Sequence, residues 1–286
     1  MKDGRYWDKG INVVEGCSPC SPGCDNCWAA SLAHRFSVTG KSYKKDGTKY
    51  WPFLTGENGK FNGRIDTHPE RLEIFYKTRK PTVFAIWNDL HHENVPWVEK
   101  GATYDIMREL TQHKFLILTK RPHILLQYYL DEEETWNPAN NIWHGLTVCN
   151  QQEADEKIPI FLKIPGKKFL SIEPMLGAIK NIPLVSRKCI TCNNPSFYIG
   201  NNVYGYNFYK PSIYCKNCGF VMKDIGYIDA VILGAETGAK ARPMNPDWAR
   251  SIRDQCAQAG VPFFLKQLDK KHNRILDGRT HDDLPY

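Results

Sequence analysis

The stretch FLILTKRPHILLQYYL, residues 115–130, holds the unit that predicts the rest of the fold. Its first five residues form an apolar run of strand length. Two basic residues follow, and Pro122 then opens a segment with helical character, as expected for a proline at a first helical position. The stretch therefore predicts a buried strand, a short polar turn and a helix.

The same alternation recurs along the chain. Besides residues 115–119, apolar runs predict strands at residues 10–14, 82–87, 142–148, 169–172, 230–233 and 261–265. Helices are predicted at residues 96–113, 122–130, 151–162 and 246–259. Alternating strands and helices indicate a parallel sheet with crossover helices. We therefore predict an α/β fold in the form of a complete or partial (βα) TIM-like barrel, with a doubly wound open sheet as the alternative.

Two regions interrupt this pattern. Residues 40–63 are rich in Gly, Lys, Tyr and Asn and indicate an irregular excursion. Residues 187–225 contain four cysteines and many aromatic residues without a helical period, which indicates a small insertion between two strands. The predicted organisation is a barrel formed by residues 1–184 and 228–286, with an insertion at residues 185–227.

The composition bounds the class of protein. The chain has 286 residues, 42% of them hydrophobic and 24% charged, which is ordinary for a globular protein with a sizeable core. A formal net charge of +7 permits DNA or RNA as a partner, and a mildly basic solvated surface explains it equally well. The sequence has no apolar run of the length of a secretory signal or a membrane span, so we expect a cytoplasmic protein without a membrane partner. In that compartment thiols stay reduced, so disulfides are not expected among the ten cysteines.

Four of those cysteines lie close together near the N-terminus. Residues 16–28 read GCSPCSPGCDNCW, and the last three thiols have the spacing C-x3-C-x2-C. Residues 28–36 are predicted to be helical, and a helix N-terminus suits an anionic group bound to thiolates. Thiolates select zinc or iron–sulfur clusters. The motif favours a [4Fe–4S] cluster, with a closed zinc site and uncoordinated thiols as alternatives; its candidate ligands are Cys17, Cys20, Cys24 and Cys27.

A second group consists of two C-x2-C pairs, Cys189 with Cys192 and Cys215 with Cys218. Two C-x2-C pairs, with four thiolates in total, predict a closed structural zinc site like that of a zinc ribbon. The alternative is a reduced loop without metal. The aromatic residues and lysines between the pairs would suit stacking on unpaired bases, or they would form the core of the small module.

Polar residues follow directly after the predicted strands. In a parallel barrel the active site lies at the carboxyl ends of the strands. We therefore expect one shared polar cavity, with separate structural ion pairs as the alternative; the residues concerned are Asp89, Lys120, Arg121, Glu173, Glu236 and Gln267. The neighbouring pair His91 and His92 is expected in an exposed loop.

Several longer motifs extend these observations over nearly the whole chain. They read SPGCDNC at residues 21–27, NDL at 88–90, LTKRP at 118–122, LSIEP at 170–174, GAETG at 234–238, VPFFLKQ at 261–267 and LDGRT at 276–280. With them the chain resembles the phage Gp37/Gp68 family, a group of three-cysteine-motif proteins that is similar to radical S-adenosylmethionine enzymes. If the protein is encoded by a phage, its location would be the host cytoplasm.

The resemblance implies a reaction and a set of site residues. An iron without a protein ligand would bind S-adenosylmethionine, and an electron from a reductant protein would cleave the cofactor into methionine and a radical that attacks the substrate, a nucleic acid or nucleotide. The catalytic residues implied are Glu173, Glu236, Lys120 and Arg121. The cofactor-binding residues implied are Asp89, Glu173, Glu236 and Gln267.

Two alternatives stay open at this point. Family members use the position of Cys17, whereas the general radical-enzyme spacing selects Cys20, so either thiol is the third ligand beside Cys24 and Cys27. If both bind, no iron is open and an electron-transfer protein results. The other alternative is a non-enzymatic phage protein that binds nucleic acid and holds structural metals. The sequence does not define the substrate, the product or the oligomeric state.

Overall fold

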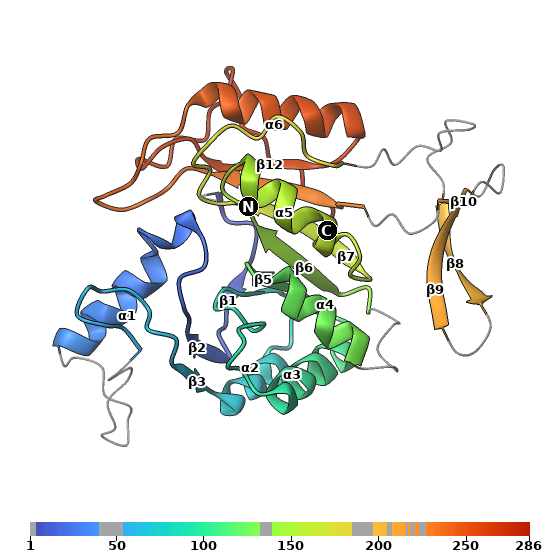
Figure 1. Cartoon of the computed structure of the whole chain (residues 1–286), viewed down its shortest axis with the longest axis horizontal. Helices are drawn as coiled ribbons and strands as arrows, with labels where there is room; N and C mark the ends of the chain where they lie inside the picture. The colour runs from blue at the N-terminus through green and yellow to red at the C-terminus, as the bar shows by residue number, and fades with distance from the viewer. Residues whose placement is uncertain are drawn as a thin grey trace.

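The computed structural model describes residues 4–39, 54–131, 139–184, 197–204, 208–215, 217, 221–222 and 227–286. Its centre is a seven-stranded parallel sheet (Figure 1). The strands, in their order across the sheet, are β1 (Lys9–Gly10), β4 (Val83–Ile86), β5 (Lys114–Thr119), β6 (Ile142–Thr147), β7 (Lys167–Ile172), β11 (Ala230–Gly234) and β12 (Phe263–Gln267).

The strands follow the chain order without a reversal, and every pair within the sheet is parallel. A doubly wound sheet would reverse its strand order near the middle, so that alternative does not apply. The sheet is curled into a half-barrel, and among the described strands its two edges, β1 and β12, are not paired with each other. The predicted α/β fold with a parallel sheet is therefore confirmed.

Helices cover the outer face of the half-barrel. They are α2 (Glu73–Lys77), α3 (Trp97–Glu109), α4 (Pro122–Asp131), α5 (Gln151–Phe161) and α6 (Pro246–Ala259), whereas α1 (Trp28–Thr39) stands at one end (Figure 1). The larger core lies between these helices and the outward side chains of the strands, such as Phe84, Ile117 and Leu170. Burial of this apolar surface is the main force that holds the helices on the sheet.

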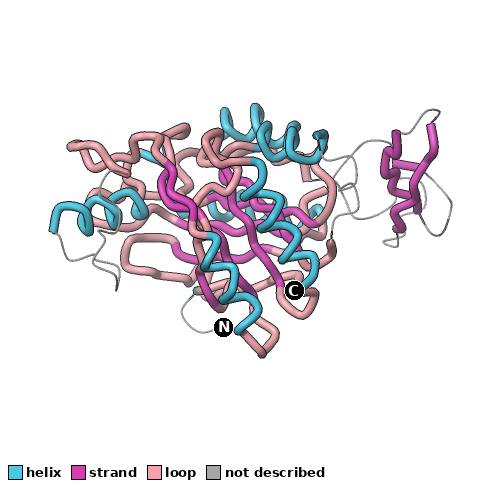
Figure 2. The backbone as a smooth tube through the Cα atoms, turned by 90° about the horizontal axis from the view of Figure 1, so that it is seen from below, coloured by secondary structure: helices cyan, strands magenta, loops and turns pink. Residues whose placement is uncertain are grey.

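The inner face of the half-barrel is also apolar. Alternate strand residues pack there, among them Leu116, Trp143 and Phe169. Gly145 makes room for the Phe169 ring, because a Cβ at that position would lie 2.3 Å from its Cζ atom. Segments near both ends of the chain complete this inner core (Figure 2). The residues that they contribute are Tyr6, Trp7, Leu284 and Tyr286.

One predicted strand is wrong. Residues 10–14 do not form a single strand, because β1 ends at Gly10 and β2 (Val14–Gly16) pairs antiparallel with β3 (Ile65–Thr67) in a separate two-stranded sheet. The physical reason lies at Asn12, whose Oδ1 accepts hydrogen bonds from the backbone N–H groups of Trp87 and Asn88. This contact caps the end of β4 and turns the chain out of the main sheet, toward the cysteine motif.

The predicted insertion contains three strands of its own. They are β8 (Phe197–Tyr204), β9 (Phe208–Cys215) and β10 (Val221–Met222), which form an antiparallel sheet in the order β10-β9-β8. Cys189, Cys192 and Cys218 lie outside the described residues, and only the backbone of Cys215 is described, so the zinc site stays a prediction. Of the excursion at residues 40–63, residues 40–53 lie outside the description too.

Among the described segments, no helix combines the length and the apolar character that a membrane crossing requires.

Candidate functional site

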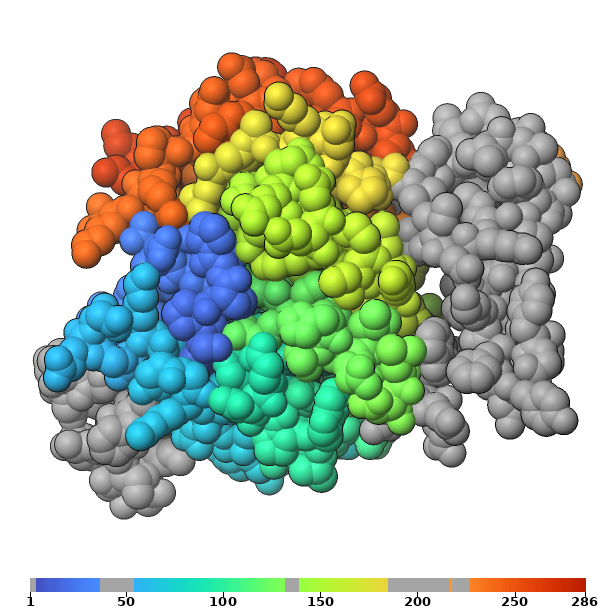
Figure 3. Space-filling model, in the orientation of Figure 1, coloured from blue at the N-terminus to red at the C-terminus, as the bar shows by residue number. Residues whose placement is uncertain are grey.

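A cavity of about 450 Å³ opens at the carboxyl ends of the parallel strands. Its walls bring together distant parts of the chain, and Figure 3 shows the N-terminal segment in blue beside the green-yellow middle and the orange-red C-terminal part. All the polar residues predicted at strand ends line it, namely Asp89, Lys120, Arg121, Glu173, Glu236 and Gln267. Three cysteines of the N-terminal motif line it as well, namely Cys17, Cys24 and Cys27.

The cysteine loop follows β2 and ends where α1 begins. Ser21 shapes its middle, because its Oγ accepts a hydrogen bond of 3.1 Å from the Gly23 N–H and caps a short 3-10 helix, Pro22–Cys24. Cys149 lies beneath this turn, with its Sγ 3.7 Å from Ser21 Oγ. This neighbour could not be predicted from the sequence, since an isolated cysteine is most often a small buried hydrophobe.

The thiols of the loop differ in exposure and ionisation. Cys20 is exposed and is not among the residues that line the cavity. A hydrogen bond from the Cys20 thiol lowers the pKa of Cys24 to about 5, although burial opposes this shift. Burial and the nearby Asp89 carboxylate raise the pKa of Cys17 to about 11. Contact with the Cys20 thiol therefore favours the thiolate form of Cys24, the form that binds metals.

Arg121 anchors the first part of the loop to the sheet. Its Nη1 lies 2.8 Å from Asp89 Oδ2, and its Nε lies 2.7 Å from Glu93 Oε2. Its Nη2 donates to the carbonyl and the hydroxyl of Ser18, at 3.0 and 2.8 Å. All three guanidinium nitrogens are thus occupied, so Arg121 fixes the residue next to Cys17 relative to the ends of β4 and β5.

A second anchor holds the other end of the loop. Glu236 Oε1 pairs with Arg242 Nη2 at 2.6 Å, and Glu236 Oε2 accepts a hydrogen bond of 3.0 Å from Asn26 Nδ2. Arg242 also donates to the Pro22 carbonyl at 3.0 Å. The sequence analysis did not assign a role to Arg242, although its place within an Arg-Pro-Met segment shortly after Glu236 offered a signal.

Glu173 and Gln267 are likewise engaged with neighbouring groups. Glu173 Oε2 accepts hydrogen bonds from Tyr6 Oη at 2.9 Å and from Ser171 Oγ at 3.2 Å. Lys266 Nζ lies 2.8 Å from Glu173 Oε1. Gln267 donates to the Ala235 carbonyl at 2.8 Å. These contacts hold both side chains in fixed positions at the floor of the cavity.

Lys120 differs from the other polar residues of the cavity. Among the described residues, its ammonium group has neither a hydrogen bond nor an ion-pair partner within 4 Å. Burial tends to lower its pKa, but the negative charge of the thiolates around it, Cys24 foremost, outweighs burial and raises the pKa. The Lys120 ammonium is therefore a cation of the cavity that lies near the thiols of the cysteine loop and has no ion-pair partner among the described residues.

The exposed loop expected around His91 and His92 is a wrong prediction. Both imidazoles are buried, with exposed fractions of 0% and 2%. His92 Nε2 lies 2.9 Å from Ser18 Oγ, and His91 Nε2 lies 2.9 Å from Tyr104 Oη on α3. The backbone after β4 folds inward because the Asp89 carboxylate accepts the His91 N–H, so this turn packs against the sheet rather than facing water.

Fold and site together define a parallel α/β half-barrel protein with a cysteine loop held over a polar cavity. The sequence matches the family described as "Protein of unknown function (DUF5131)" over residues 3–285, and the chain belongs to this family. No curated protein and no solved structure matches it.

Proposed function

We propose that this protein is a radical S-adenosylmethionine-type iron–sulfur enzyme on a TIM-like (βα) half-barrel, and that its substrate is a nucleic acid or a nucleotide. One observation carries the proposal. The three-cysteine loop is anchored at both ends over a cavity at the carboxyl ends of the strands, where the Lys120 ammonium is available to an anionic ligand.

The donor set fits an iron–sulfur cluster. Thiolates are the common ligands of such clusters, and the neighbouring Cys20 thiol lowers the pKa of Cys24, which favours its thiolate form. A single zinc ion with Zn–S bonds of about 2.3 Å needs its sulfur ligands roughly 3.8 Å apart. Among the described residues, no three thiols lie within 4.8 Å of one another, so the loop is more open than a tetrahedral zinc site. This spread favours a larger inorganic group.

The cavity lining favours one choice of ligands. Cys17, Cys24 and Cys27 line the cavity and Cys20 does not. We assign the first three as the cluster ligands, which leaves one coordination position for a small molecule. Cys20 then acts through its hydrogen bond to Cys24, which favours the thiolate form of that residue. If instead all four thiols bind, the protein is an electron-transfer protein.

The remaining residues position the cofactors. When bound, the cluster and S-adenosylmethionine supply the radical chemistry, and the chain supplies orientation and exclusion of water. Lys120 is suited to hold the carboxylate of S-adenosylmethionine. Asp89, Glu173, Glu236 and Gln267 are already held by neighbours, so they present carboxylate and amide oxygens at fixed places. We propose that Arg121 acts as a positioning residue for the loop.

Paired cysteine variants test the assignment. The protein is purified anaerobically, reconstituted with iron and sulfide, and assayed for 5′-deoxyadenosine after addition of a reductant. We expect the cluster and the product to be lost in Cys17→Ala and retained in Cys20→Ala. The reverse pattern would move the third ligand to Cys20. A wild-type protein that holds the cluster and never cleaves S-adenosylmethionine would refute the enzymatic proposal.

A lysine pair tests the cavity itself. Lys120→Gln removes the available cation, and we expect it to weaken S-adenosylmethionine binding at least ~10-fold, in line with the loss of one charge-assisted hydrogen bond. Lys180→Gln, at an exposed position outside the cavity, serves as the matched control. Binding is measured calorimetrically on reconstituted protein. Equal affinities for the two variants would exclude Lys120 from the cofactor site.

The substrate class rests on the charge of the chain. A formal net charge of +7 is compatible with an acidic partner such as DNA or RNA. Binding to single-stranded DNA and RNA, measured at several salt concentrations, should weaken as salt rises. Absence of binding at low salt would leave a free nucleotide as the substrate. The proposed chemistry also requires a reductant protein as a partner. Separately, we propose that the module with Cys189, Cys192, Cys215 and Cys218 holds a structural zinc ion.

A further inference from the structure

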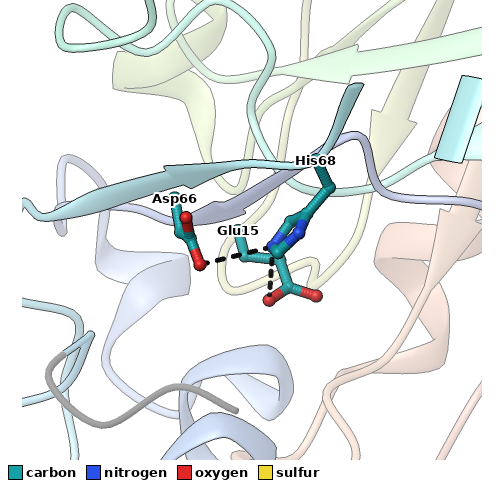
Figure 4. A group of neighbouring side chains, drawn as sticks. All are labelled: Glu15, Asp66 and His68. Carbon is teal, nitrogen blue, oxygen red and sulfur yellow. Dashed lines mark ion pairs between the residues drawn. The ribbon is translucent and has the colours of Figure 1, made fainter. Parts of the chain in front are cut away.

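A cluster of acidic residues around one buried histidine lies outside the cavity (Figure 4). Glu15 on β2 and Asp66 on β3 are directly opposite each other in the antiparallel pair, and His68 follows two residues after Asp66. Like charges directly opposite each other on neighbouring strands destabilise a sheet. The position of these two carboxylates therefore calls for a cation between them.

The contacts converge on the Nε2 atom of His68. It lies 3.0 Å from Glu15 Oε2 and 3.5 Å from Asp66 Oδ2 (Figure 4), and the three ligand atoms are all within 4.8 Å of one another. His68 is 2% exposed and Glu15 is 3% exposed. Although Glu15 is close enough for an ion pair, Nε2 has no hydrogen bond of acceptable geometry. A buried imidazole nitrogen thus faces two carboxylates without a hydrogen bond to either.

The other groups of the cluster favour a metal ion. His68 Nδ1 lies 3.2 Å from Glu70 Oε1, and a carboxylate that accepts this N–H is the usual outer partner of a metal-binding histidine. When the ring proton is on Nδ1 and is donated to Glu70, the lone pair of Nε2 is free to bind a metal. Arg71 Nη1 lies 2.6 Å from Glu15 Oε1, which leaves Oε2 as the oxygen that faces His68. Three carboxylates and one guanidinium leave a net charge of −2, which a divalent cation on Nε2 would balance. Burial opposes protonation of His68, but the Glu15 carboxylate outweighs burial and raises its pKa, so a proton on Nε2 competes with the metal ion.

The spacing of the atoms agrees with this interpretation. Zinc bonds to histidine nitrogen and carboxylate oxygen at about 2.0–2.1 Å, which places ligand atoms of a tetrahedral site roughly 3.3 Å apart. The observed separations of 3.0 and 3.5 Å lie on either side of that value. We propose that Glu15, Asp66 and His68 bind a divalent cation of the zinc class, separate from the cysteine sites.

Such an ion would stabilise the antiparallel pair of β2 and β3, whose strand β2 leads directly into the cysteine loop. Glu15 is two residues from Cys17, and Gly16 pairs with Ile65 in the same strand pair. A proton on Nε2 could take the place of the metal ion between His68 and the two carboxylates. His68 would then be a member of a simple ion-pair network. A metal ion and a proton predict different metal contents, so the two can be separated by experiment.

The test compares zinc content among four proteins of full length: wild type, Asp66→Asn, His68→Gln and the control Glu73→Gln. Glu73 is an exposed carboxylate of the neighbouring helix that pairs with Lys77. Each protein is equilibrated with Zn²⁺, dialysed and analysed for bound metal. The cysteine sites are common to all four proteins, so their zinc cancels in the comparison.

We expect Asp66→Asn and His68→Gln to hold one zinc ion fewer per chain than wild type and Glu73→Gln. Zinc should also raise the melting temperature of the latter two proteins more than that of the former two. Equal zinc content in all four would overturn the proposal and assign the gap to a proton. If His68→Gln does not fold, Asp66→Asn decides, because the Asp66 side chain is 57% exposed and its replacement disturbs no core packing.

Discussion

Gly23 determines how closely the cysteine loop approaches the sheet. A Cβ at this position would lie 2.6 Å from Cys149 Sγ and 3.2 Å from Pro174 Cδ. Its φ angle is not among the positive values, so space and not backbone conformation requires a glycine. The residue therefore links the loop to β6 and β7 through direct packing.

From this packing we expect Gly23→Ala to lower the free energy of unfolding by about 1–3 kcal/mol, the usual range for overpacking. It should also reduce the iron content after reconstitution, because the loop is pushed away from the sheet. The double variant Gly23→Ala/Cys149→Ala should recover part of the loss, since it removes the sulfur that the new methyl group meets. Urea unfolding and iron analysis check this. Additive losses in the double variant would contradict the packing argument.

For single residues, the sequence predicted which side chains line the cavity but not which groups they bond to. Asp89, Lys120 and Glu236 could be placed together because the carboxyl ends of parallel strands meet at one edge. Their contacts depend on residues far away in the chain, such as Asn26, which is 210 positions from Glu236. No local pattern encodes such a contact. The cluster around His68 was not predicted for the same reason, because Glu15 reaches Asp66 and His68 only through the pairing of β2 with β3.

Elements with local boundary signals were predicted most closely. The predicted helix at residues 246–259 agrees with α6 at both ends, because Asn245 accepts a hydrogen bond from the Asp247 N–H and Gly260 adopts a φ of 65°. The predicted strand at residues 10–14 failed because its end depends on the distant contact of Asn12 with Trp87. The short β3 gave no apolar run and was not predicted.

A buried network of hydrogen bonds connects β6 with α3 and α4. His144 Nδ1 lies 3.3 Å from Tyr104 Oη, and His144 Nε2 lies 2.8 Å from Tyr129 Oη. His91 Nε2 contacts the same Tyr104 hydroxyl. Burial, with a smaller effect of Lys100, lowers the pKa of His91 to about 3, and burial also lowers the pKa of His144 well below its usual range. Both histidines are therefore neutral in the folded protein at neutral pH.

This network makes the stability of the protein depend on pH. In the unfolded chain both histidines take up protons near pH ~6.5, whereas in the folded chain they do so only at much lower pH. The stability they contribute is therefore complete above about pH 6.5 and is lost as the pH falls toward 3. We expect each histidine to add about 1.4 kcal/mol per pH unit to the slope of the unfolding free energy in this window.

Urea unfolding at several pH values between 7 and 4 checks this expectation. His91→Gln should reduce the slope by the contribution of one histidine, while His123→Gln, at an exposed position on α4, should leave it unchanged. An identical slope for wild type and His91→Gln would mean that the network is solvated before the chain unfolds.

In the described part of the molecule, the segments around Tyr6 and Tyr286 cover the inner face of the half-barrel. Tyr286 lies against the Trp143 ring, with 5.2 Å between the ring centroids, and its hydroxyl donates to the Tyr6 carbonyl at 2.8 Å. Tyr6 in turn donates to Glu173 at the floor of the cavity. The C-terminal segment is thus connected, through the N-terminal segment, to the candidate site.

If this cover stabilises the fold, Tyr286→Ala should lower the unfolding free energy by about 1–3 kcal/mol, because it removes a partly buried aromatic ring that packs against the inner core. Tyr286→Phe should cost only about 0.5–1.5 kcal/mol, the usual net value of one hydrogen bond. Tyr76→Ala is the control, since Tyr76 is 48% exposed on α2. Urea unfolding of the three variants separates ring packing from the hydrogen bond. A Tyr286→Ala loss no larger than that of Tyr76→Ala would show that the curled sheet is stable without the terminal segments, and that Glu173 does not depend on them for its position.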